Sequence, residues 1–437
     1  MTDQTAVTVR PARRVAGRLR VPSDKSISHR AVMFSALARG RSEIRNLTPG
    51  QDVDATIDCL RRLGVAIVAD AAAPADAPPT WRVRGCDGPG GLAAAADLEA
   101  RNSGTTTRLL MGVLAGATGA YRIRGDASLE RRPMRRVVEP LTRMGADIAT
   151  TDGHLPAAIA GRPLRGIDYT LPVASAQVKS AILLAGVFAS GETAVREPAP
   201  TRNHTEIGLG AFGVHVDHEP GLARVRGGQF LAAAAIDVPG DPSSAAFWAA
   251  AAAALPGSSI DIDDVALNPT RTGFLDVLRR FGAAVEVEPT VASPGDREPR
   301  GRIRVSHREV GDVRIDPAEV PGLIDELPVL AALATHGGRL TVTGAAELRV
   351  KESDRISALA RGLRAMGGHV EEFADGFHID GRTRLTGGLV DAVGDHRLAM
   401  AFSIAALGAS GDTRVAGAGC VAVSYPGFFD VLASVCR

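Results

Sequence analysis

The chain has 437 residues, enough for two to four domains and for an apolar core that needs no disulfide or metal. Its charge is nearly balanced, with 50 Lys+Arg against 49 Asp+Glu, which argues against a general polyanion binder, and an aromatic content of 4% argues against stacking surfaces for nucleic acid. The four cysteines lack zinc-ligand spacing, the first residues lack the apolar core of a signal peptide, and the longest apolar stretch, 245–255, is too short to cross a bilayer, so we expect a cytoplasmic protein without nucleic-acid or membrane partners.

One pattern recurs six times along the chain. In each copy a short strand runs into a polar loop and a first helix, which ends at a glycine before a second strand. The six openings lie at 18–30, 98–110, 169–183, 236–248, 313–330 and 388–400. The glycines that follow the helices are Gly40, Gly119, Gly191, Gly257, Gly338 and Gly411.

A second marker follows in the first five copies, where another helix ends in a hydrophobic residue and a glycine before the next strand. These markers lie at 60–67, 141–148, 209–216, 278–285 and 363–370. Each copy therefore reads strand–helix–strand–helix–strand–strand over about 70 residues, and the six copies predict an α/β protein. A TIM barrel or a Rossmann domain would need a β/α period near 30 residues or a GxGxxG motif after a strand, and neither is present.

The sixth copy stops at Arg437 before its closing strands. The first 20 residues contain the segments TAVTVR and GRLRV, which read as spare strands that could supply them. Two Pro/Ala/Gly-rich stretches, 71–80 and 293–301, are predicted to be solvated hairpin loops.

Cations stand at several of the predicted helix starts, where the helix dipole disfavours them and favours anions. Lys25 and Arg30 lie at the first start, Arg108 follows Gly104 at the second, and Arg397 lies at the sixth. Such cations indicate an anionic ligand that offsets the cost, although a single Ser, Thr, Asn or Asp at a helix start is more simply a cap.

The stretch 347–367 carries a further cluster before an amphipathic helix, for which Ser353 is the predicted N-cap. The cluster comprises Lys351, Glu352 and Arg355. Lysine is informative in this chain because only Lys25, Lys179 and Lys351 occur among the 50 cations. Because the chain otherwise uses arginine, these three positions are candidates for sites that require a compact ammonium group. The alternative is that the three lysines occur there by chance.

The motifs PSDKSISHR, NSGTTTRLL, RRPM, SAQVKSAILLAG, TRNHTE, PGDPSSAAFW, DELPVLA, LRVKESDR and GDHRLAM, in this order, resemble the 5-enolpyruvylshikimate-3-phosphate synthase family over essentially the whole chain. The resemblance implies an inverse α/β, barrel-like fold of two similar domains, each built from three βαβαββ repeats. The implied domains are residues 23–237, on the shikimate 3-phosphate side, and residues 1–22 with 238–437, on the phosphoenolpyruvate side. The crossovers between them are expected near Val21-Pro22 and Val238-Pro239.

The same resemblance implies a transferase that moves the enolpyruvyl group of phosphoenolpyruvate to the 5-hydroxyl of shikimate 3-phosphate and releases phosphate. By this resemblance, the residues expected at shikimate 3-phosphate are Lys25, Ser26, Arg30, Ser175, Ala176, Gln177, Thr201, Arg202, Asp325 and Lys351. Those expected at phosphoenolpyruvate are Lys25, Asn102, Gly104, Arg132, Gln177, Arg355 and Arg397. Closure of the two domains around the substrates is a further family implication.

The reaction needs a base for the 5-hydroxyl proton and an acid for C3 of the enol. We assign Asp325 as the base and Glu352 as the acid, with Lys25 as a second candidate proton donor. Collapse of the tetrahedral adduct releases phosphate, which Arg and Lys side chains would stabilise. We expect no metal and no organic cofactor, only the two small-molecule substrates, and a monomer.

Two departures bear on the herbicide glyphosate, which occupies the phosphoenolpyruvate pocket in this family. Some branches have a lysine where this chain has Val423, and its absence resembles a bacterial branch that includes tolerant members. Tolerant members, however, have alanine where this chain has Gly104. We therefore expect sensitivity to glyphosate, in competition with phosphoenolpyruvate. Ala176 is a smaller departure, since some branches have a second serine there.

Two alternatives belong to other functions. A UDP-N-acetylglucosamine enolpyruvyl transferase shares the fold but carries a reactive cysteine on an N-terminal-domain loop, whereas Cys59 lies in a predicted helix and Cys86 at a strand edge. A non-catalytic repeat scaffold would account for the six copies but not for the carboxylates Asp325 and Glu352 beside cations.

Overall fold

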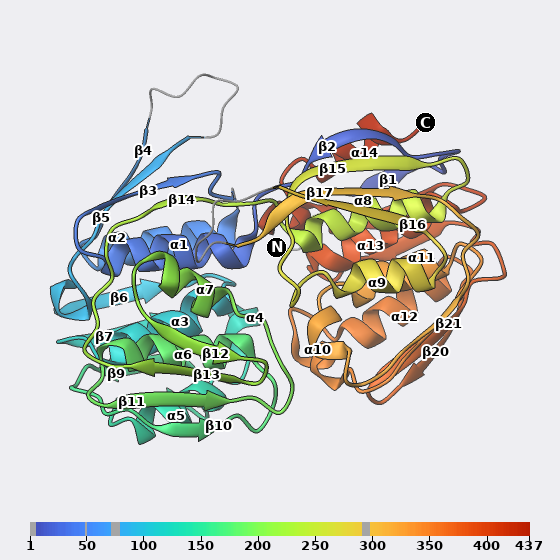
Figure 1. The fold of residues 1–437 in the computed structure, drawn as a ribbon. Helices are drawn as coiled ribbons and strands as arrows, with labels where there is room; N and C mark the ends of the chain where they lie inside the picture. Colours follow the sequence, from blue (N-terminus) through green and yellow to red (C-terminus); the bar gives the residue numbers. More distant parts are fainter. Residues whose placement is uncertain (1–5, 49, 71–78, 291–297) are drawn as a thin grey trace. The chain divides into compact units, whose positions relative to one another are not determined.

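The computed structural model describes residues 6–48, 50–70, 79–290 and 298–437. Its backbone contacts divide the chain into two compact units. The N-terminal unit comprises Ser23–Pro239 with Ala292–Glu298, and the C-terminal unit comprises Met1–Pro22, Gly240–Val291 and Pro299–Arg437. Figure 1 shows the two units coloured along the chain, and each unit is described by itself below.

The N-terminal unit holds three four-stranded sheets, one for each of the first three predicted copies. The first has the order β14-β3-β5-β4, formed by β14 (Ala235–Asp237), β3 (Arg41–Arg45), β5 (Trp81–Arg84) and β4 (Ala66–Ala69), with α1 (Lys25–Leu37) and α2 (Gln51–Arg62). The second has the order β6-β7-β9-β8, formed by β6 (Ala95–Glu99), β7 (Ala120–Arg124), β9 (His154–Ala160) and β8 (Asp147–Thr151), with α3 (Gly104–Ala115), α4 (Ala127–Glu130) and α5 (Arg135–Arg143). A 3-10 turn, Pro89–Gly91, precedes β6.

The third sheet of this unit has the order β10-β11-β13-β12. Its elements are β10 (Asp168–Thr170), β11 (Glu192–Arg196), β13 (Leu222–Arg226) and β12 (Val216–Glu219), with α6 (Ala176–Phe188) and α7 (His204–Ala211). In all three sheets the first two strands are parallel and the remaining neighbours are antiparallel, as the repeated pattern predicts.

The C-terminal unit repeats this plan. The fourth sheet, β16-β17-β15-β2, contains β16 (Ala284–Pro289), β17 (Arg300–Ser306), β15 (Ser259–Ala266) and β2 (Ala16–Arg20), with α8 (Pro242–Ala254) and α9 (Gly273–Arg280). The fifth, β18-β19-β21-β20, contains β18 (Asp312–Ile315), β19 (Arg339–Val342), β21 (Gly376–Asp380) and β20 (His369–Phe373), with α10 (Val320–Leu323), α11 (Leu327–Ala334), the 3-10 turn Ala346–Val350 and α12 (Arg355–Ala365).

The sixth sheet has only three strands among the described residues, in the order β1-β23-β22. They are β1 (Val7–Val9), β23 (Thr413–Ala416) and β22 (Gly388–Asp391), with α13 (His396–Ala406), the 3-10 turn Ala418–Val423 and α14 (Phe428–Val435). The expectation that N-terminal strands complete this copy is confirmed for β1, which pairs antiparallel with β23. It is wrong for the second segment, because β2 pairs with β15 in the fourth sheet.

The opening strands of the first and fourth copies are exchanged. The segment before α1 (β2) lies in the fourth sheet beside β15, and the segment before α8 (β14) lies in the first sheet beside β3. The chain thus passes between units at Pro22/Ser23 and again at Pro239/Gly240. The sequence pattern could not separate these partners because the two strands precede similar polar loops and helices.

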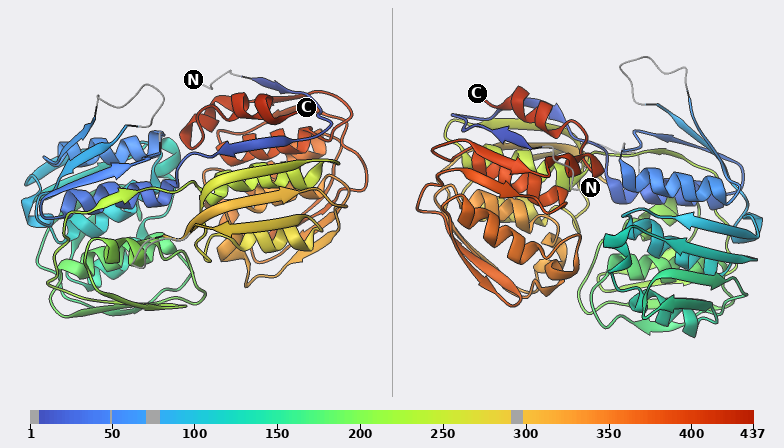
Figure 2. Two further views of the ribbon diagram at one scale, coloured as in Figure 1. Left: turned by 45° about the horizontal axis from the view of Figure 1, so that its top comes forward. Right: turned by 180° about the vertical axis from the view of Figure 1, so that it is seen from behind.

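The first helix of each copy lies inside its unit, and the sheets lie outside it, as the ribbon views show (Figure 2). All thirteen residues of α8 are buried, and so are all eleven of α13, whereas β17 buries only alternate residues. Alternation along a strand marks a sheet with one face on the core and one in solvent. The predicted α/β class, with helices inside and sheets outside, is confirmed.

The second-marker glycines end their helices in the left-handed region. Gly64, Gly145, Gly213, Gly282 and Gly367 have φ between 82° and 104°, which side chains rarely adopt. The predicted hairpin loops at 71–80 and 293–301 lie largely outside the described residues, and the strands that flank them, β4 with β5 and β16 with β17, do pair antiparallel.

Candidate active site

The start of α1 places an ammonium beside a carboxylate. Asp24 caps the helix by accepting a hydrogen bond from the Ile27 amide at 2.8 Å. Lys25 Nζ lies 2.8 Å from Asp52 Oδ2 on α2, and the two side chains are 19% and 13% exposed. Asp52 was not singled out in the sequence, although its place in the first turn of a helix is typical of a carboxylate that interacts with the dipole.

Arg30, one turn further along α1, ties three helices together. Its Nε donates to Thr205 Oγ1 at 2.7 Å and its Nη2 to Ser180 Oγ at 2.6 Å. Its Nη1 donates to the carbonyl of Ser26 at 2.9 Å. Burial lowers the pKa of Arg30 to about 10, and the charge of Glu206 is the largest that opposes this. The guanidinium therefore stays charged at neutral pH inside the N-terminal unit.

The starts of α3 and α6 are linked through Gln177. Arg108 donates to Gln177 Oε1, and Gln177 Nε2 donates to Thr105 Oγ1 at 2.9 Å. Arg108, the fifth residue of α3, was named as a cation near a helix start but was not among the predicted site residues. Its place near that start was the signal that could have identified it.

Gly104, the first residue of α3, lies against two guanidinium groups. A β-carbon at this position would be 3.2 Å from Arg108 Nη1 and 3.4 Å from Arg132 Nη1. Arg132 Nη2 also donates to Asn102 Oδ1 at 2.6 Å, and Asn102 in turn donates to Asp126 at 2.7 Å. Four predicted residues, Asn102, Gly104, Arg132 and Gln177, thus meet around the start of α3.

The other predicted residues of this unit lie at α6 and before α7. Ser175 caps α6 by accepting from the Val178 amide at 3.4 Å, and Ala176 is the first residue of that helix. Thr201 and Arg202 lie in the segment between β11 and α7. The Thr201 hydroxyl donates to Glu197, whose side chain is buried and which was not among the predicted site residues.

In the C-terminal unit, Arg355 is the centre of an ionic cluster. Its side chain is 1% exposed, and its Nε lies 2.7 Å from Asp395 Oδ2, its Nη2 2.5 Å from Glu352 Oε2 and its Nη1 3.4 Å from Asp325 Oδ1. Burial would lower the pKa of Arg355, but the charges of the three carboxylates outweigh it and raise the pKa. Asp395 also caps α13, accepting from the Arg397 amide at 3.0 Å.

Two further cations face Asp325. Arg397 Nη1 donates to the Asp325 carbonyl at 2.9 Å, and its Nη2 lies 3.6 Å from Oδ2. Lys351 Nζ lies 3.9 Å from Oδ1. All five residues predicted in this unit, Asp325, Lys351, Glu352, Arg355 and Arg397, therefore belong to one cluster.

Two details of this cluster differ from the sequence analysis. The N-cap of α12 is Asp354, which accepts from the Ser357 amide at 3.1 Å, and not the predicted Ser353. Ser353 instead donates to Asp395 Oδ2 at 3.1 Å. Asp395 lies in the GDHRLAM motif and was not among the predicted site residues. Burial would raise its pKa, but the Arg355 guanidinium more than offsets burial and holds the pKa below its usual value.

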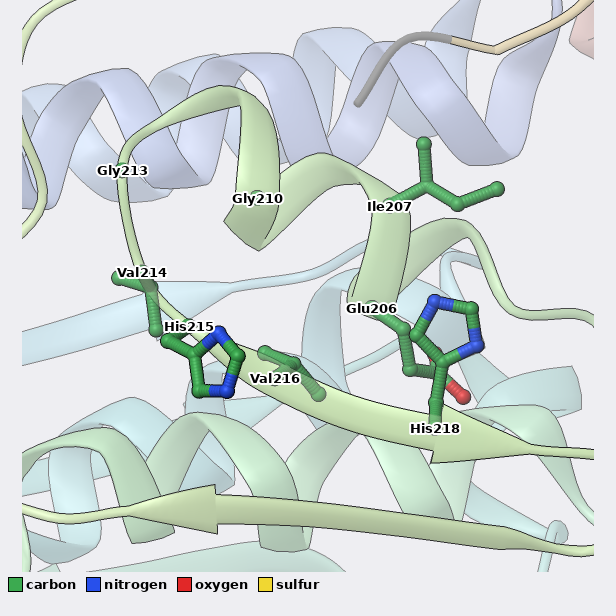
Figure 3. A pocket seen from close by; sticks show the side chains of 8 residues that line it. All are labelled: Glu206, Ile207, Gly210, Gly213, Val214, His215, Val216 and His218. Carbon is green, nitrogen blue, oxygen red and sulfur yellow. The ribbon is translucent and has the colours of Figure 1, made fainter. Parts of the chain in front are cut away.

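A surface pocket of about 300 Å³ lies elsewhere in the N-terminal unit, between α7 and β12 (Figure 3). It is lined by Glu206, Ile207, Gly210, Gly213, Val214, His215, Val216 and His218. None of the predicted site residues lines this pocket. The candidate site is therefore marked by the residues around the start of α3 and by the ionic cluster around Arg355, and not by this pocket. Within the described part of the chain, no helix is long and apolar enough to cross a membrane, and no three His, Cys, Asp or Glu side chains are grouped to hold a metal.

Known proteins match this chain over nearly its whole length. The family model of EPSP synthase (3-phosphoshikimate 1-carboxyvinyltransferase) matches residues 9–432. A relative from Acidithiobacillus ferrooxidans named 3-phosphoshikimate 1-carboxyvinyltransferase is 49% identical, covering 97% of this chain and 96% of its own. A relative of the same name from Desulforamulus reducens is 46% identical, covering 98% of this chain and 99% of its own.

The fold agrees with these matches. A solved EPSP synthase from Acinetobacter baumannii superposes with a TM-score of 0.85 at 40% identity, covering 99% of this chain and 98% of that one. With six repeated sheets, two ionic clusters at helix starts and a family model that spans residues 9–432, the chain belongs to the EPSP synthase family.

Proposed function

We propose that this chain transfers the enolpyruvyl group of phosphoenolpyruvate to the 5-hydroxyl of shikimate 3-phosphate, giving 5-enolpyruvylshikimate 3-phosphate and phosphate in the synthesis of chorismate and the aromatic amino acids. The observation that carries the proposal is the cluster around Arg355, where the carboxylates Asp325 and Glu352 lie among three cations. Such a cluster suits a reaction of anionic substrates that needs both a base and an acid. The relatives named 3-phosphoshikimate 1-carboxyvinyltransferase support it.

The N-terminal unit would hold shikimate 3-phosphate. We assign this role to Lys25, Ser26, Arg30, Ser175, Ala176, Gln177, Thr201 and Arg202, joined by Asp325 and Lys351 from the C-terminal unit. The backbone amides in the first turns of α1 and α6 and the guanidinium of Arg202 are the kinds of donor that a phosphate needs.

Phosphoenolpyruvate would be held by Lys25, Asn102, Gly104, Arg132, Gln177, Arg355 and Arg397. The support within the N-terminal unit is the pair of guanidinium groups, Arg108 and Arg132, that converge on Gly104. A glycine leaves room for an anion against these cations. Arg108 joins this set as a residue that the structure adds to the sequence assignment.

For the proton transfers, Asp325 would accept the proton of the 5-hydroxyl as its oxygen bonds to C2. Glu352 would deliver a proton to C3, with Lys25 as the second candidate donor. In the elimination, C3 loses a proton, the C2–C3 double bond re-forms and phosphate leaves C2. The negative charge that builds on the departing phosphate would be stabilised by the Arg and Lys side chains. The substrates themselves supply every group that is transferred, so the proposal calls for no cofactor.

We also propose residues 23–237 as one domain and residues 1–22 with 238–437 as the other, which the two compact units support. Every assigned residue comes from one chain, so a monomer would be sufficient. We also propose that the protein works in the cytoplasm, where its charged, phosphorylated substrates would be found.

The rival enolpyruvyl transferase for a UDP-amino sugar uses a reactive cysteine. Burial raises the pKa of Cys59 to about 12 and that of Cys86 to about 11, so neither thiol readily forms the reactive thiolate. The scaffold alternative does not account for the Arg355 cluster.

The test measures phosphate release from phosphoenolpyruvate with shikimate 3-phosphate or UDP-N-acetylglucosamine as the acceptor. We expect turnover with the first and none with the second, and the reverse result would favour the rival. A thermal shift with shikimate 3-phosphate checks binding separately, because 100 times the Kd stabilises a protein by about 2.7 kcal/mol. No turnover and no shift at millimolar ligand would favour the scaffold.

A further inference from the structure

The third lysine of the chain is the most buried of the three, and the assignment above leaves it without a role. Lys179 on α6 is 3% exposed, and its Nζ lies 2.8 Å from Glu197 Oε2 and 2.8 Å from Glu206 Oε1. Both carboxylates are 2% exposed. A buried ammonium with two buried carboxylates is costly to assemble unless every partner is in place, so its geometry is strongly constrained.

The two carboxylates stand at the two ends of one segment. Glu197 follows strand β11, and Glu206 lies in the first turn of α7, seen in Figure 3 where that helix approaches β12. Thr201 and Arg202 lie between them. One ammonium thus fastens both ends of the segment that carries these two residues, and we call Lys179, Glu197 and Glu206 the lysine staple.

The staple also reaches into the middle of the segment. The Thr201 hydroxyl donates to Glu197 Oε1, and the Thr201 amide donates to Glu197 Oε2 at 3.4 Å. Next to the staple in sequence, Ser180 and Thr205 both bond to Arg30. The residues proposed to hold shikimate 3-phosphate on α1 and on this segment are therefore fixed through adjacent positions of α6 and α7.

Lys179 pairs directly with Glu197 and Glu206. The charge of Glu206 is also the largest one acting on Arg30, followed by those of Asp24, Arg202 and Glu298. A compact ammonium suits the point between the two acids, where a planar guanidinium has a fixed fork and more volume.

We propose that Lys179 is a positioning residue that holds Thr201 and Arg202 in the geometry that binds the phosphate of shikimate 3-phosphate. This rests on the proposed function for the identity of the ligand, whereas the staple itself stands on the contacts above. Removing the staple loosens the segment and weakens the binding of shikimate 3-phosphate. The binding of phosphoenolpyruvate and the rate of the chemical step are much less affected.

The test uses the double variant Lys179→Met/Glu197→Gln in the full chain. It removes one positive and one negative charge, so Glu206 remains to balance Arg30 and the unit keeps its local charge. Lys179→Met alone leaves two buried acids and can simply fail to fold. The control is Arg196→Gln, which removes the neighbouring cation of β11 from an exposed pair with Asp168 and leaves the staple intact.

Two measurements are made on each protein: steady-state kinetics, and hydrogen exchange of the peptide spanning 198–203 without substrate. For the double variant we expect a KM for shikimate 3-phosphate raised about tenfold or more, since hydrogen bonds to charged groups carry that much affinity. We expect the KM for phosphoenolpyruvate and kcat to change by less than about threefold. Exchange at 198–203 should be faster than in the wild type, and peptides of the second sheet unchanged. Arg196→Gln should match the wild type.

An unchanged KM for shikimate 3-phosphate in the double variant overturns the positioning role, whatever the exchange shows. A raised KM with unchanged exchange at 198–203 overturns the staple as its cause. If the wild type does not turn over shikimate 3-phosphate at all, the proposed function fails, and the exchange result still decides whether Lys179 fastens the segment.

Discussion

At the scale of single residues, each of the three lysines has a carboxylate within ion-pair distance: Lys25 has Asp52, Lys351 has Asp325, and Lys179 has Glu197 and Glu206. Many arginines instead pair on exposed strands, as Arg196 does with Asp168. Buried arginines such as Arg355 and Arg271 pair with carboxylates as well. The inference from the rarity of lysine, and its link to catalysis at Lys25 and Lys351, therefore stay predictions.

The contacts of Gly104 sharpen the expectation for glyphosate. We expect inhibition of the wild type in competition with phosphoenolpyruvate, with an inhibition constant not far above the KM for phosphoenolpyruvate. In Gly104→Ala the new methyl group crowds Arg108 and Arg132, and we expect the inhibition constant to rise by about tenfold or more. Inhibition kinetics on both proteins measure this.

The control for this prediction is Gly90→Ala, because a β-carbon there meets no atom within 4 Å. It should leave the inhibition unchanged. A wild type that is already insensitive, with Gly104→Ala changing little, would show that the space beside residue 104 does not decide herbicide binding.

The buried side chain of His29 makes the free energy of unfolding depend on pH. Its Nδ1 lies 2.7 Å from Thr56 Oγ1, and burial lowers its pKa to about 3 from an ordinary value of 6.5. Between those two pH values the His29 imidazole is protonated in the unfolded chain but stays neutral in the folded protein. The free energy of unfolding therefore falls as the pH is lowered from 6.5 towards 3, by at most about 1.4 kcal/mol per pH unit from this group.

Urea unfolding of the wild type and of His29→Gln at pH 6 and pH 5 tests this. The variant should lose about 1 kcal/mol less than the wild type over that interval. His215→Gln serves as the control, because that side chain is 82% exposed and should leave the wild-type difference unchanged. Equal losses in the wild type and His29→Gln would mean that His29 accepts a proton when folded.

At the scale of elements, the close approach of α3 and α6 sets the Arg108–Gln177 link. A β-carbon at Gly112 would lie 2.3 Å from the Ala181 carbonyl oxygen, so Gly112→Ala must push the two helices apart. We expect a loss of roughly 3 kcal/mol of stability and a higher KM for phosphoenolpyruvate. Gly322→Ala, in α10 with open space around it, should change stability by no more than about 1 kcal/mol. Equal unfolding midpoints for the two variants would contradict this packing.

At the scale of the whole molecule, the N-terminal strands β1 and β2 complete two sheets of the C-terminal unit. Deleting residues 6–20 leaves both sheets with an unpaired edge. Limited proteolysis should then cleave the C-terminal unit well before the N-terminal unit, and an excess of a peptide of residues 6–20 should slow that cleavage. Equal cleavage of both units, unaffected by the peptide, would contradict the strand exchange.

The repeat pattern predicted the second, third and fifth sheets closely, because helix-ending glycines and alternating strands are local signals. It could not predict that β2 and β14 are exchanged, since strand partners depend on long-range packing. In the site, cations at helix starts stood out in the sequence. The carboxylates Asp52, Glu197 and Asp395 did not stand out, because the cation that each one pairs with is known only once the fold brings the two together.

Asp325 connects the Arg355 cluster to the proposed proton transfer, so the proposed mechanism depends on its role as the base. The decisive measurement is kcat of Asp325→Ala, made beside the binding of shikimate 3-phosphate to the same protein. We expect kcat to fall by a factor on the order of 10²–10⁴, typical of a lost general base, while binding is retained. A variant that keeps nearly full kcat would show that Asp325 is not the base.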